Sequence, residues 1–475
     1  PPPAPAPQPR PPRTPGRPPA PGVPPHRLPG RAPDGALSGP ETWHRFSLAD
    51  FVAEHGAHAS YATLATEVMW PFVEGSIDRD DFAAIVTDAY STFDTDDVVP
   101  LRDMGDGSHL LELFHGPTLA FKDVALQLVG RLFDHELGQR GEHVTIVAAT
   151  SGDTGSAAIE AVRDRDAIDI FVLHPHERTS PLQRRQMTTV DAVNVHNVAI
   201  RGTFDDCQDL VKAMFADQPF REAVHMSAVN SINWARVMAQ IVYYWWAALQ
   251  LGRIDEPVSF AVPTGNFGNV FAGFCARRMG LDVAQFVVGS NRNDILTRFF
   301  DTGEMTIETV EPTLSPSMDI QISSNLERLL FELFSRDGEA VAELFATFRD
   351  VGTVTIDPYR LGALREIWDA ARIDDDATLA IIAAVRDDTG EVVDPHTAVG
   401  IGAAKRCHRF GSVPMVALAT AHPAKFPAAI EEAIGAAPPV PPRLGAVAHL
   451  DEHFDVLADD LVAVERYILD RTRVP

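Results

Sequence analysis

Residues 144–162, which read VTIVAATSGDTGSAAIEAV, contain the pattern that decides the fold. The first six are mostly apolar or β-branched, which predicts a buried strand over 144–149. Two glycines then predict a turn over 150–155, and the small residues that follow predict a helix over 156–162. A buried strand, a turn and a helix in this order are part of the unit that builds a parallel sheet with helices on both faces.

The same alternation of short apolar runs with helical segments continues along the chain. Ahead of it, Ser47 is the expected N-cap of a helix at 48–55, and Asp80 or Asp81 is expected to begin a second helix that ends at Tyr90. The chain is therefore predicted to be an α/β protein with a helical N-terminal segment. Further strands are expected at 168–173, 193–200, 258–262, 285–288 and, as the last one, 414–419.

Three of the expected strands end in polar turns that lead into helices, at 150–155, 264–269 and 420–425. In an open α/β sheet, ligands collect beyond the carboxyl ends of the strands, where helix N-termini offer free N–H groups to anions. The three turns are therefore the expected walls of one site. Gly265 and Gly268 would let the backbone approach a phosphate, although neither the dinucleotide-binding motif nor the P-loop motif is present. Taken singly, each turn is also compatible with an ordinary strand-to-helix connection.

A lysine stands among apolar positions where the stretch 113–123, LFHGPTLAFKD, leads into a helical pattern. Apolar residues at the spacing of one buried helix face surround this lysine, Lys122. Two interpretations are open. Lys122 is either a snorkelling lysine at a helix start or a desolvated amine with a lowered pKa, able to form a Schiff base.

A further group of polar donors, at residues 230–236 with the sequence NSINWAR, precedes an apolar helix. Amide, hydroxyl and guanidinium donors together suit a second phosphate, and a capped helix start with a surface arginine is the alternative. No metal site is expected, because no zinc-ligand spacing relates His174, His176, His396 and His422.

Composition and charge exclude several classes of protein. At 475 residues the chain is expected to form two or more domains, and its net charge of −26 argues against nucleic acid and anionic membrane surfaces as partners. No apolar run of about 18 residues is present, so no membrane-spanning helix is expected. The three cysteines, Cys207, Cys275 and Cys407, are far apart, which suits a reducing cytoplasm.

Five separated motifs, in this order, resemble those of the threonine synthase family. These enzymes depend on pyridoxal phosphate and have the tryptophan-synthase-β fold, also called PLP fold type II. The motifs are 113–123, 149–155, 230–236, 265–269 and 420–426.

The resemblance implies an α/β fold with two open parallel-sheet domains and a helical N-terminal preface at 41–98. The large, cofactor-binding domain would consist of 99–135 and 226–475, and the small α/β domain of 136–225. Residues 1–40 are dominated by Pro, Ala, Gly and Arg and are expected to be a disordered tail.

The resemblance also implies roles toward the cofactor, position by position. Lys122 matches the lysine that forms the Schiff base, and Thr420 matches the residue beside the pyridine nitrogen. Asp153 belongs to the turn beside the cofactor's 3-hydroxyl, and some relatives carry Asn there. The loop that holds the cofactor phosphate matches Gly265, Asn266, Phe267, Gly268 and Asn269.

For the substrate, Ser151 and Thr154 match turn residues that take its carboxylate. Asn230, Ser231 and Arg236 match positions that bind the phosphate of O-phospho-L-homoserine. The implied reaction converts this small molecule and water to L-threonine and phosphate, with Lys122 as the catalytic acid and base.

Two alternatives remain open. A related pyridoxal-phosphate lyase or β-replacement enzyme, such as a threonine or serine dehydratase or a cysteine-synthase-like protein, would share Lys122 and the glycine loop but has no use for a second phosphate site. The second alternative is a catalytically silent paralogue that binds the cofactor. It is supported by the absence of the Tyr-x-Ser-Thr-Arg-Gly motif, which is common near the start of threonine synthases. Both a monomer and a homodimer are compatible with the sequence.

Overall fold

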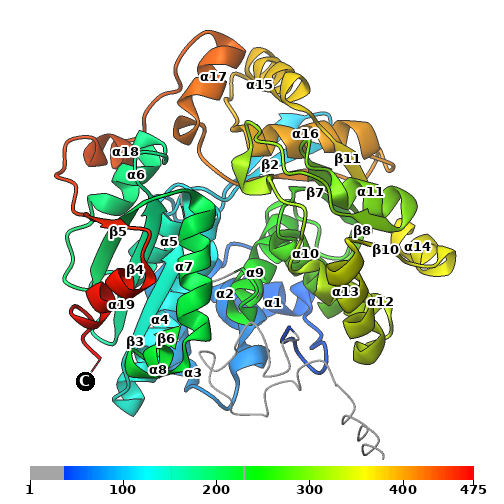
Figure 1. Ribbon diagram of the computed structural model, residues 1–475. Coiled ribbons are helices and arrows are strands. Elements are labelled where there is room, and N and C mark those ends of the chain that lie inside the picture. Colours follow the sequence, from blue (N-terminus) through cyan, green and yellow to red (C-terminus); the bar gives the residue numbers. More distant parts are fainter. Residues whose placement is uncertain (1–36, 151, 228–230, 475) are drawn as a thin grey trace, which may run out of the picture.

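Two mainly parallel sheets organise the computed structural model, which describes residues 37–150, 152–227 and 231–474 (Figure 1). In both sheets, every pair of neighbouring strands is parallel except the antiparallel β1–β2 hairpin. The larger sheet has the order β1 (Leu101–Gly105), β2 (Ser108–Glu112), β12 (Met415–Ala419), β7 (Val258–Pro263), β8 (Val283–Ser290) and β11 (Trp368–Arg372). The smaller has the order β13 (Asp455–Ala458), β5 (Val195–Arg201), β4 (Ile168–Pro175), β3 (Val144–Ala149) and β6 (Met226–Ser227). A separate pair is formed by β9 (Glu304–Thr306) and β10 (Thr353–Thr355).

Helices connect the strands and precede them, so the predicted α/β class is confirmed. The N-terminal helices are α1 (Leu48–His55), α2 (Tyr61–Val73) and α3 (Arg79–Tyr90). Those of the middle of the chain are α4 (Lys122–Arg140), α5 (Asp153–Val162), α6 (Pro181–Thr188), α7 (Phe204–Ala216), α8 (Gln218–Ala223), α9 (Trp234–Gln250), α10 (Gly268–Met279), α11 (Ile295–Thr302) and the 3₁₀ turn η2 (Pro316–Met318). The remainder are α12 (Leu326–Leu333), α13 (Gly338–Val351), α14 (Pro358–Arg365), α15 (Asp375–Thr389), α16 (Pro395–Cys407), the 3₁₀ turn η3 (Pro423–Lys425), α17 (Pro427–Ile434), α18 (Pro442–Val447) and α19 (Leu461–Leu469).

All six strands expected from the sequence are present, with ends that move by no more than two residues. The expectation that the strand at 414–419 is the last one was wrong, because β13 follows it and pairs with β5. The edge strands of both sheets, β1, β11, β13 and β6, were not predicted. Edge strands are partly exposed and lack the continuous apolar run of a central parallel strand, so their sequence signal is weak.

Sheet membership differs from the expected domain boundaries at two places. Both β6 and β13 belong to the smaller sheet, whereas residues 226–475 were all expected in the larger domain. The division into domains remains our proposal, revised so that the small domain includes β6 and the C-terminal segment from β13 onward.

The N-terminal segment forms the helices that its capping residues predict. Ser47 caps α1 by accepting a hydrogen bond from the Asp50 N–H at 3.1 Å, as expected. The helix expected to begin at Asp80 or Asp81 begins at Arg79 instead, because the Asp78 carboxylate is the N-cap and accepts from both of those backbone N–H groups.

The expected disordered tail lies mostly outside the described residues, which begin at Leu37. Its last residues are ordered, contrary to expectation. Leu37 and Ser38 are buried against α12, where Arg328 donates to the Ser38 carbonyl at 2.9 Å.

Helices α4 and α9 form the centre of the core. Sixteen consecutive residues of α9, from Trp234 to Leu249, are buried, and most of them are apolar; the polar residues Arg236 and Gln240 face the cavity described below. Helix α9 packs against α2, α4 and α10, and α4 packs against α5. Burial stabilises each large apolar side chain here by about 1.5–3 kcal/mol, so the first turns of α4 and α10, on which the site is built, rest on a rigid core.

Candidate active site

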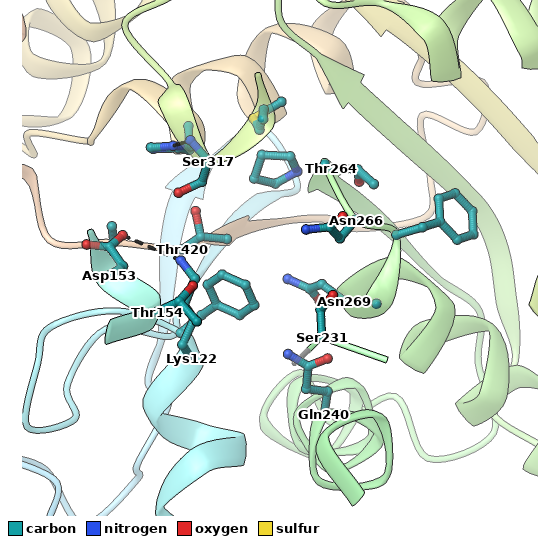
Figure 2. A pocket seen from close by; sticks show the side chains of 18 of the residues that line it. Lys122, Asp153, Thr154, Ser231, Gln240, Thr264, Asn266, Asn269, Ser317 and Thr420 are labelled. Carbon is teal, nitrogen blue, oxygen red and sulfur yellow. Dashed lines mark hydrogen bonds and ion pairs between the residues drawn. The ribbon is translucent and has the colours of Figure 1, made fainter. Parts of the chain in front are cut away.

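A cavity of about 200 Å³ opens where the carboxyl ends of β7 and β12 meet the first turns of α4, α5 and α10 (Figure 2). Residues from all three predicted turns line it, so the prediction that these turns are walls of one site is confirmed. Two of the predicted residues, Ser151 and Asn230, lie outside the described part of the chain. The lining residues are Phe121, Lys122, Asp153, Thr154, Ser231, Arg236, Gln240, Pro263, Thr264, Gly265, Asn266, Phe267, Gly268, Asn269, Ser317, Met318, His396, Thr420 and Ala421.

Lys122 is the first residue of α4, and its side chain is buried with 10% exposure, so it does not snorkel. Its Nζ lies 3.5 Å from Asp153 Oδ2. Burial lowers the pKa of the Lys122 amine; Asp153 opposes this effect, and the positive charges of Lys425 and Arg236 add to it. Of the two interpretations of the sequence, the geometry favours the desolvated amine.

The turn that presents Lys122 is held by Asp123, the next residue. The Asp123 carboxylate accepts from the Thr118 N–H at 2.8 Å and from the Thr118 hydroxyl at 2.7 Å. A Cβ on Gly116 would lie 2.4 Å from the Asp123 Cβ, so only glycine allows this close approach. Burial raises the pKa of Asp123 to about 6. The Phe121 N–H also donates to the Thr420 carbonyl at 2.8 Å, which ties the start of α4 to the end of β12.

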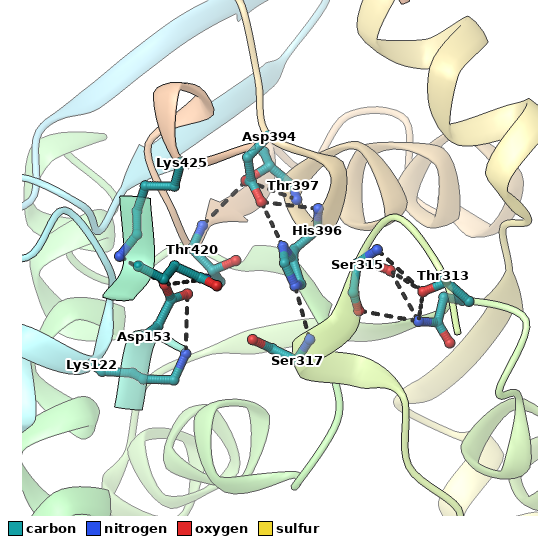
Figure 3. Close-up of polar contacts among 12 residues, drawn as sticks. Lys122, Asp153, Thr313, Ser315, Ser317, Asp394, His396, Thr397, Thr420 and Lys425 are labelled. Carbon is teal, nitrogen blue, oxygen red and sulfur yellow. Dashed lines mark hydrogen bonds and ion pairs between the residues drawn. The ribbon is translucent and has the colours of Figure 1, made fainter. Parts of the chain in front are cut away.

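Asp153, the first residue of α5, lies between two lysines (Figure 3). Its Oδ1 is 2.7 Å from the Nζ of Lys425, whose side chain is fully buried and also donates to the Thr118 carbonyl at 2.8 Å. Burial alone would raise the pKa of Asp153, but Lys425 and then Lys122 outweigh burial and hold that pKa well below its usual range. Asp153 is therefore a buried carboxylate. Sequence reasoning missed Lys425, although it lies inside the motif that begins at Thr420.

The loop from Gly265 to Asn269 leads from β7 into α10. Phe267, in the left-handed region at φ 63°, turns its ring into the core against Phe300 and Trp368, so its backbone rather than its side chain is available to a ligand. No side chain caps the N-terminus of α10, which leaves backbone N–H groups free for an anion.

Asn269 adds a side-chain donor to this loop. Its Oδ1 accepts from the hydroxyls of Tyr243 and Tyr244, at 2.5 and 3.0 Å. Its Nδ2 is buried and has no partner among the described residues. An uncapped helix N-terminus with an unpaired buried amide donor fits the phosphate of a cofactor.

Thr420, at the end of β12, belongs to a polar network. Its N–H donates to the hydroxyl of Thr397 at 3.2 Å, and that hydroxyl in turn donates to the carboxylate of Asp394. The same carboxylate holds Nδ1 of His396 at 2.7 Å, and His396 Nε2 accepts from the Ser317 N–H at 3.3 Å. His396 is thus a structural histidine of the cavity wall. In the described residues, no cluster of His, Cys, Asp or Glu could hold a metal ion.

The first two turns of α9, with Arg236 and Gln240, and Ser231 ahead of the helix form the remaining wall. The Arg236 side chain is buried and has no ion-pair or hydrogen-bond partner within the described ranges. Burial lowers the pKa of Arg236 to about 10, so the guanidinium is still protonated at neutral pH. A buried, unpaired guanidinium beside a cavity is suited to an anionic ligand. Sequence reasoning missed Gln240 and Ser317, which carry no local signal.

A buried lysine that shares a cavity with an uncapped helix N-terminus at the ends of parallel strands is typical of a pyridoxal-phosphate enzyme, and comparison with known proteins agrees. The family model described as "Pyridoxal-phosphate dependent enzyme" matches residues 109–346. Models of the threonine synthase N terminus and of the C-terminal region of threonine synthase match residues 26–90 and 397–468.

The chain belongs to the threonine synthase family. It is 53% identical to threonine synthase from Pseudomonas aeruginosa over 92% of this chain and 93% of that one, and 42% identical to the enzyme from Corynebacterium glutamicum with the same coverage. A solved structure of threonine synthase from Brucella melitensis with bound PLP is 49% identical, with a TM-score of 0.92 over 94% of this chain and 96% of that one. The predicted family, fold type and cofactor are thereby confirmed. No helix in the described ranges is long and apolar enough to cross a membrane.

Proposed function

We propose that this protein converts O-phospho-L-homoserine and water to L-threonine and phosphate with pyridoxal phosphate as its cofactor. The observation that carries the proposal is a buried lysine with two separate anion-binding groups around one cavity, the loop at 265–269 and the α9 wall with Arg236. A phosphorylated amino acid and a phosphorylated cofactor need both. The identity to threonine synthases over more than nine-tenths of the chain supports the same conclusion.

In this proposal the cofactor is held at three places. Lys122 would hold it covalently through Nζ, the loop residues Gly265–Asn269 would bind its phosphate, and Thr420 would bind its ring nitrogen. Asp153 would face the ring's 3-hydroxyl. When bound, pyridoxal phosphate supplies an electron-withdrawing ring that stabilises negative charge at substrate carbons.

Lys122 would carry the protons once the substrate amine has replaced it. The overall change breaks the Cγ–O bond to phosphate, gives Cγ a proton, and replaces one hydrogen of Cβ by the hydroxyl of water. Lys122 Nζ would remove the Cα proton and return it, and would move a proton from Cβ to Cγ. This work needs a neutral amine, and the burial that lowers the pKa of Lys122 favours one.

Substrate groups would be bound on both sides of Lys122. The Thr154 hydroxyl, with Ser151 from outside the described residues, would take the carboxylate near the N-terminus of α5, where free N–H groups favour an anion. Ser231 and Arg236, with Asn230 from outside the described residues, would bind the substrate phosphate and stabilise it as it leaves.

We also propose a cytoplasmic location. All three cysteines are unpaired, which supports a reducing, cytoplasmic location.

Product analysis tests the function. The purified chain with pyridoxal phosphate should release phosphate from O-phospho-L-homoserine and form L-threonine in equal amounts. Formation of 2-oxobutyrate from L-threonine, without threonine synthesis, would show a dehydratase instead. A chain that binds the cofactor but turns over neither substrate would be the silent paralogue.

Lys425 should set the pH dependence of the reaction. Lys425→Met removes a positive charge that holds down the pKa values of both Asp153 and Lys122, so both should rise. Lys122 would then stay protonated to higher pH, and the acidic limb of the kcat profile should move to higher pH.

The control variants are Lys425→Arg, which keeps the charge, and Lys405→Met, which removes an exposed lysine on α16. Both should leave the limb where it is. If the pH profile of Lys425→Met coincides with that of the parent protein, the charge of Lys425 does not change the pKa of Lys122.

A further inference from the structure

Behind the phosphate loop lies a pair of tyrosines that the proposed reaction does not use. Tyr243 and Tyr244 are consecutive residues of α9, and both rings are fully buried. The Tyr243 hydroxyl donates to Asn269 Oδ1 at 2.5 Å, and the Tyr244 hydroxyl lies 3.0 Å from both Oδ1 and the carbonyl oxygen of Asn269. One side-chain amide on α10 is therefore held by two hydroxyls from a neighbouring helix.

These contacts fix which way the amide faces. A tyrosine hydroxyl has one proton, and burial raises the pKa values of both tyrosines well above the usual value, so each buried hydroxyl keeps a proton that needs an acceptor. The Tyr244 proton can go to the Asn269 carbonyl, but the Tyr243 hydroxyl has no acceptor other than the Asn269 side chain in the described residues, so the amide atom beside it is the oxygen. The NH₂ group of Asn269 consequently faces away from the tyrosines.

On its other side, Asn269 faces the cavity. The residue is 8% exposed and lines the cavity, and its Nδ2 is buried without a partner in the described residues. Figure 2 shows this nitrogen on the side of Asn269 that faces Lys122. A buried amide donor without an acceptor is unfavourable, and a bound anion would remove that cost.

The tyrosine rings are held independently of their hydroxyls. The Tyr244 ring packs edge-on against Phe260, with ring centroids 4.8 Å apart, and a Cβ on Gly273 would lie 2.6 Å from its Cε1. The two tyrosine rings also contact each other, with centroids 5.0 Å apart. Replacing either tyrosine by phenylalanine should therefore remove a hydrogen bond and leave the packing intact.

We propose that Tyr243 and Tyr244 are positioning residues for the cofactor, because their hydroxyls orient the Asn269 amide so that Nδ2 donates to the cofactor phosphate. The inference rests on the proposed role of Gly265–Asn269 as the phosphate loop. Neither tyrosine touches the cofactor; each acts through Asn269. The two hydroxyls fix the orientation of the Asn269 amide before the cofactor binds. Binding then loses less side-chain entropy than it would if the amide were free to rotate.

The experiment measures the dissociation constants of pyridoxal phosphate and of pyridoxal, which lacks the phosphate, for the full-length chain by equilibrium dialysis. Tyr243→Phe and Tyr244→Phe should each weaken binding of pyridoxal phosphate roughly three- to tenfold, the worth of one hydrogen bond, and the double variant more. Pyridoxal should bind all these variants as it binds the parent protein.

Tyr61→Phe is the matched control, since Tyr61 is fully buried in the same core and its hydroxyl has no partner in the described residues. It should leave both constants unchanged. In an Asn269→Ala background, adding Tyr243→Phe should have no further effect, because the amide through which the tyrosine acts is gone.

Two outcomes would count against different statements. In the first outcome, Asn269→Ala weakens the binding of pyridoxal phosphate, but the tyrosine variants either bind it as the parent does or lose affinity for both ligands equally. The positioning role of the tyrosines would then be wrong, and the assignment of Asn269 to the phosphate loop would stand. If Asn269→Ala itself binds pyridoxal phosphate normally, the assignment of Asn269 to the phosphate loop fails, and the positioning role fails with it. The single variants decide the question if the double variant does not fold.

Discussion

Lys122→Ala should lower the rate of threonine formation by roughly 10⁴-fold or more, the upper range for loss of a general acid and base, since the same amine also holds the cofactor. The variant should lose the absorbance band near the visible edge that a lysine-bound pyridoxal phosphate gives. The amine is buried, lies 3.5 Å from Asp153 Oδ2, and has a pKa lowered mainly by burial. Absorbance spectra and a phosphate-release assay on the same preparation measure both effects.

The matched control is Lys405→Ala, which removes an exposed lysine of α16 and should change neither the spectrum nor the rate. If the band survives in Lys122→Ala, another lysine holds the cofactor. Lys425 would then be the residue to test, because it is the other buried lysine beside Asp153.

Arg236→Ala should raise the KM for O-phospho-L-homoserine about 10²-fold and leave the cofactor band intact. The guanidinium is buried beside the cavity without a protein partner in the described residues, so the substrate phosphate would be its counter-ion. A charge-assisted hydrogen bond contributes about 1.5–3 kcal/mol, and each 1.4 kcal/mol is a factor of ten in affinity. Steady-state kinetics over a wide substrate range give the change in KM.

Arg236→Lys serves as the comparison, since it keeps the charge but loses the paired donors of the guanidinium, and it should fall between the parent and the alanine variant. Loss of the cofactor band in Arg236→Ala would mean that the two phosphate sites have been assigned the wrong way round.

The sequence predicted the parts of this site that are encoded locally. The strand at 144–149 forms as predicted, and a helix follows both the turn after it and the glycine turn at 265–269. The two helices begin earlier than predicted, at Asp153 and at Gly268, so the last residues of each predicted turn form the first helical turn. Because parallel strands of one sheet place their carboxyl ends at one edge, the turns after β12 and β7 were expected at one cavity. The turn after β3 belongs to the smaller sheet, and only the packing of the two sheets brings it to the same cavity. The motif order then identified the family, and the comparisons confirmed it.

Whether Lys122 is reactive could not be decided from its helix alone. A lysine at a helix start has the same local sequence whether its amine reaches water or is buried, and only packing distinguishes the two. In the structure, α4 begins against the end of β12, and Asp153 of α5 faces the amine.

Other contacts at the site depend on tertiary structure alone. Lys425 meets Asp153 across more than 250 residues of sequence, and the hydroxyls of Tyr243 and Tyr244 meet Asn269 on a different helix. The edge strands were missed for a related reason, as half-exposed strands have no continuous apolar run. Local propensity and spacing determine which segments become strands, turns and helices, because those forces act between near neighbours in the chain. Which buried charge finds which partner depends on contacts between distant segments, and these exist only once the helices have packed around the sheets.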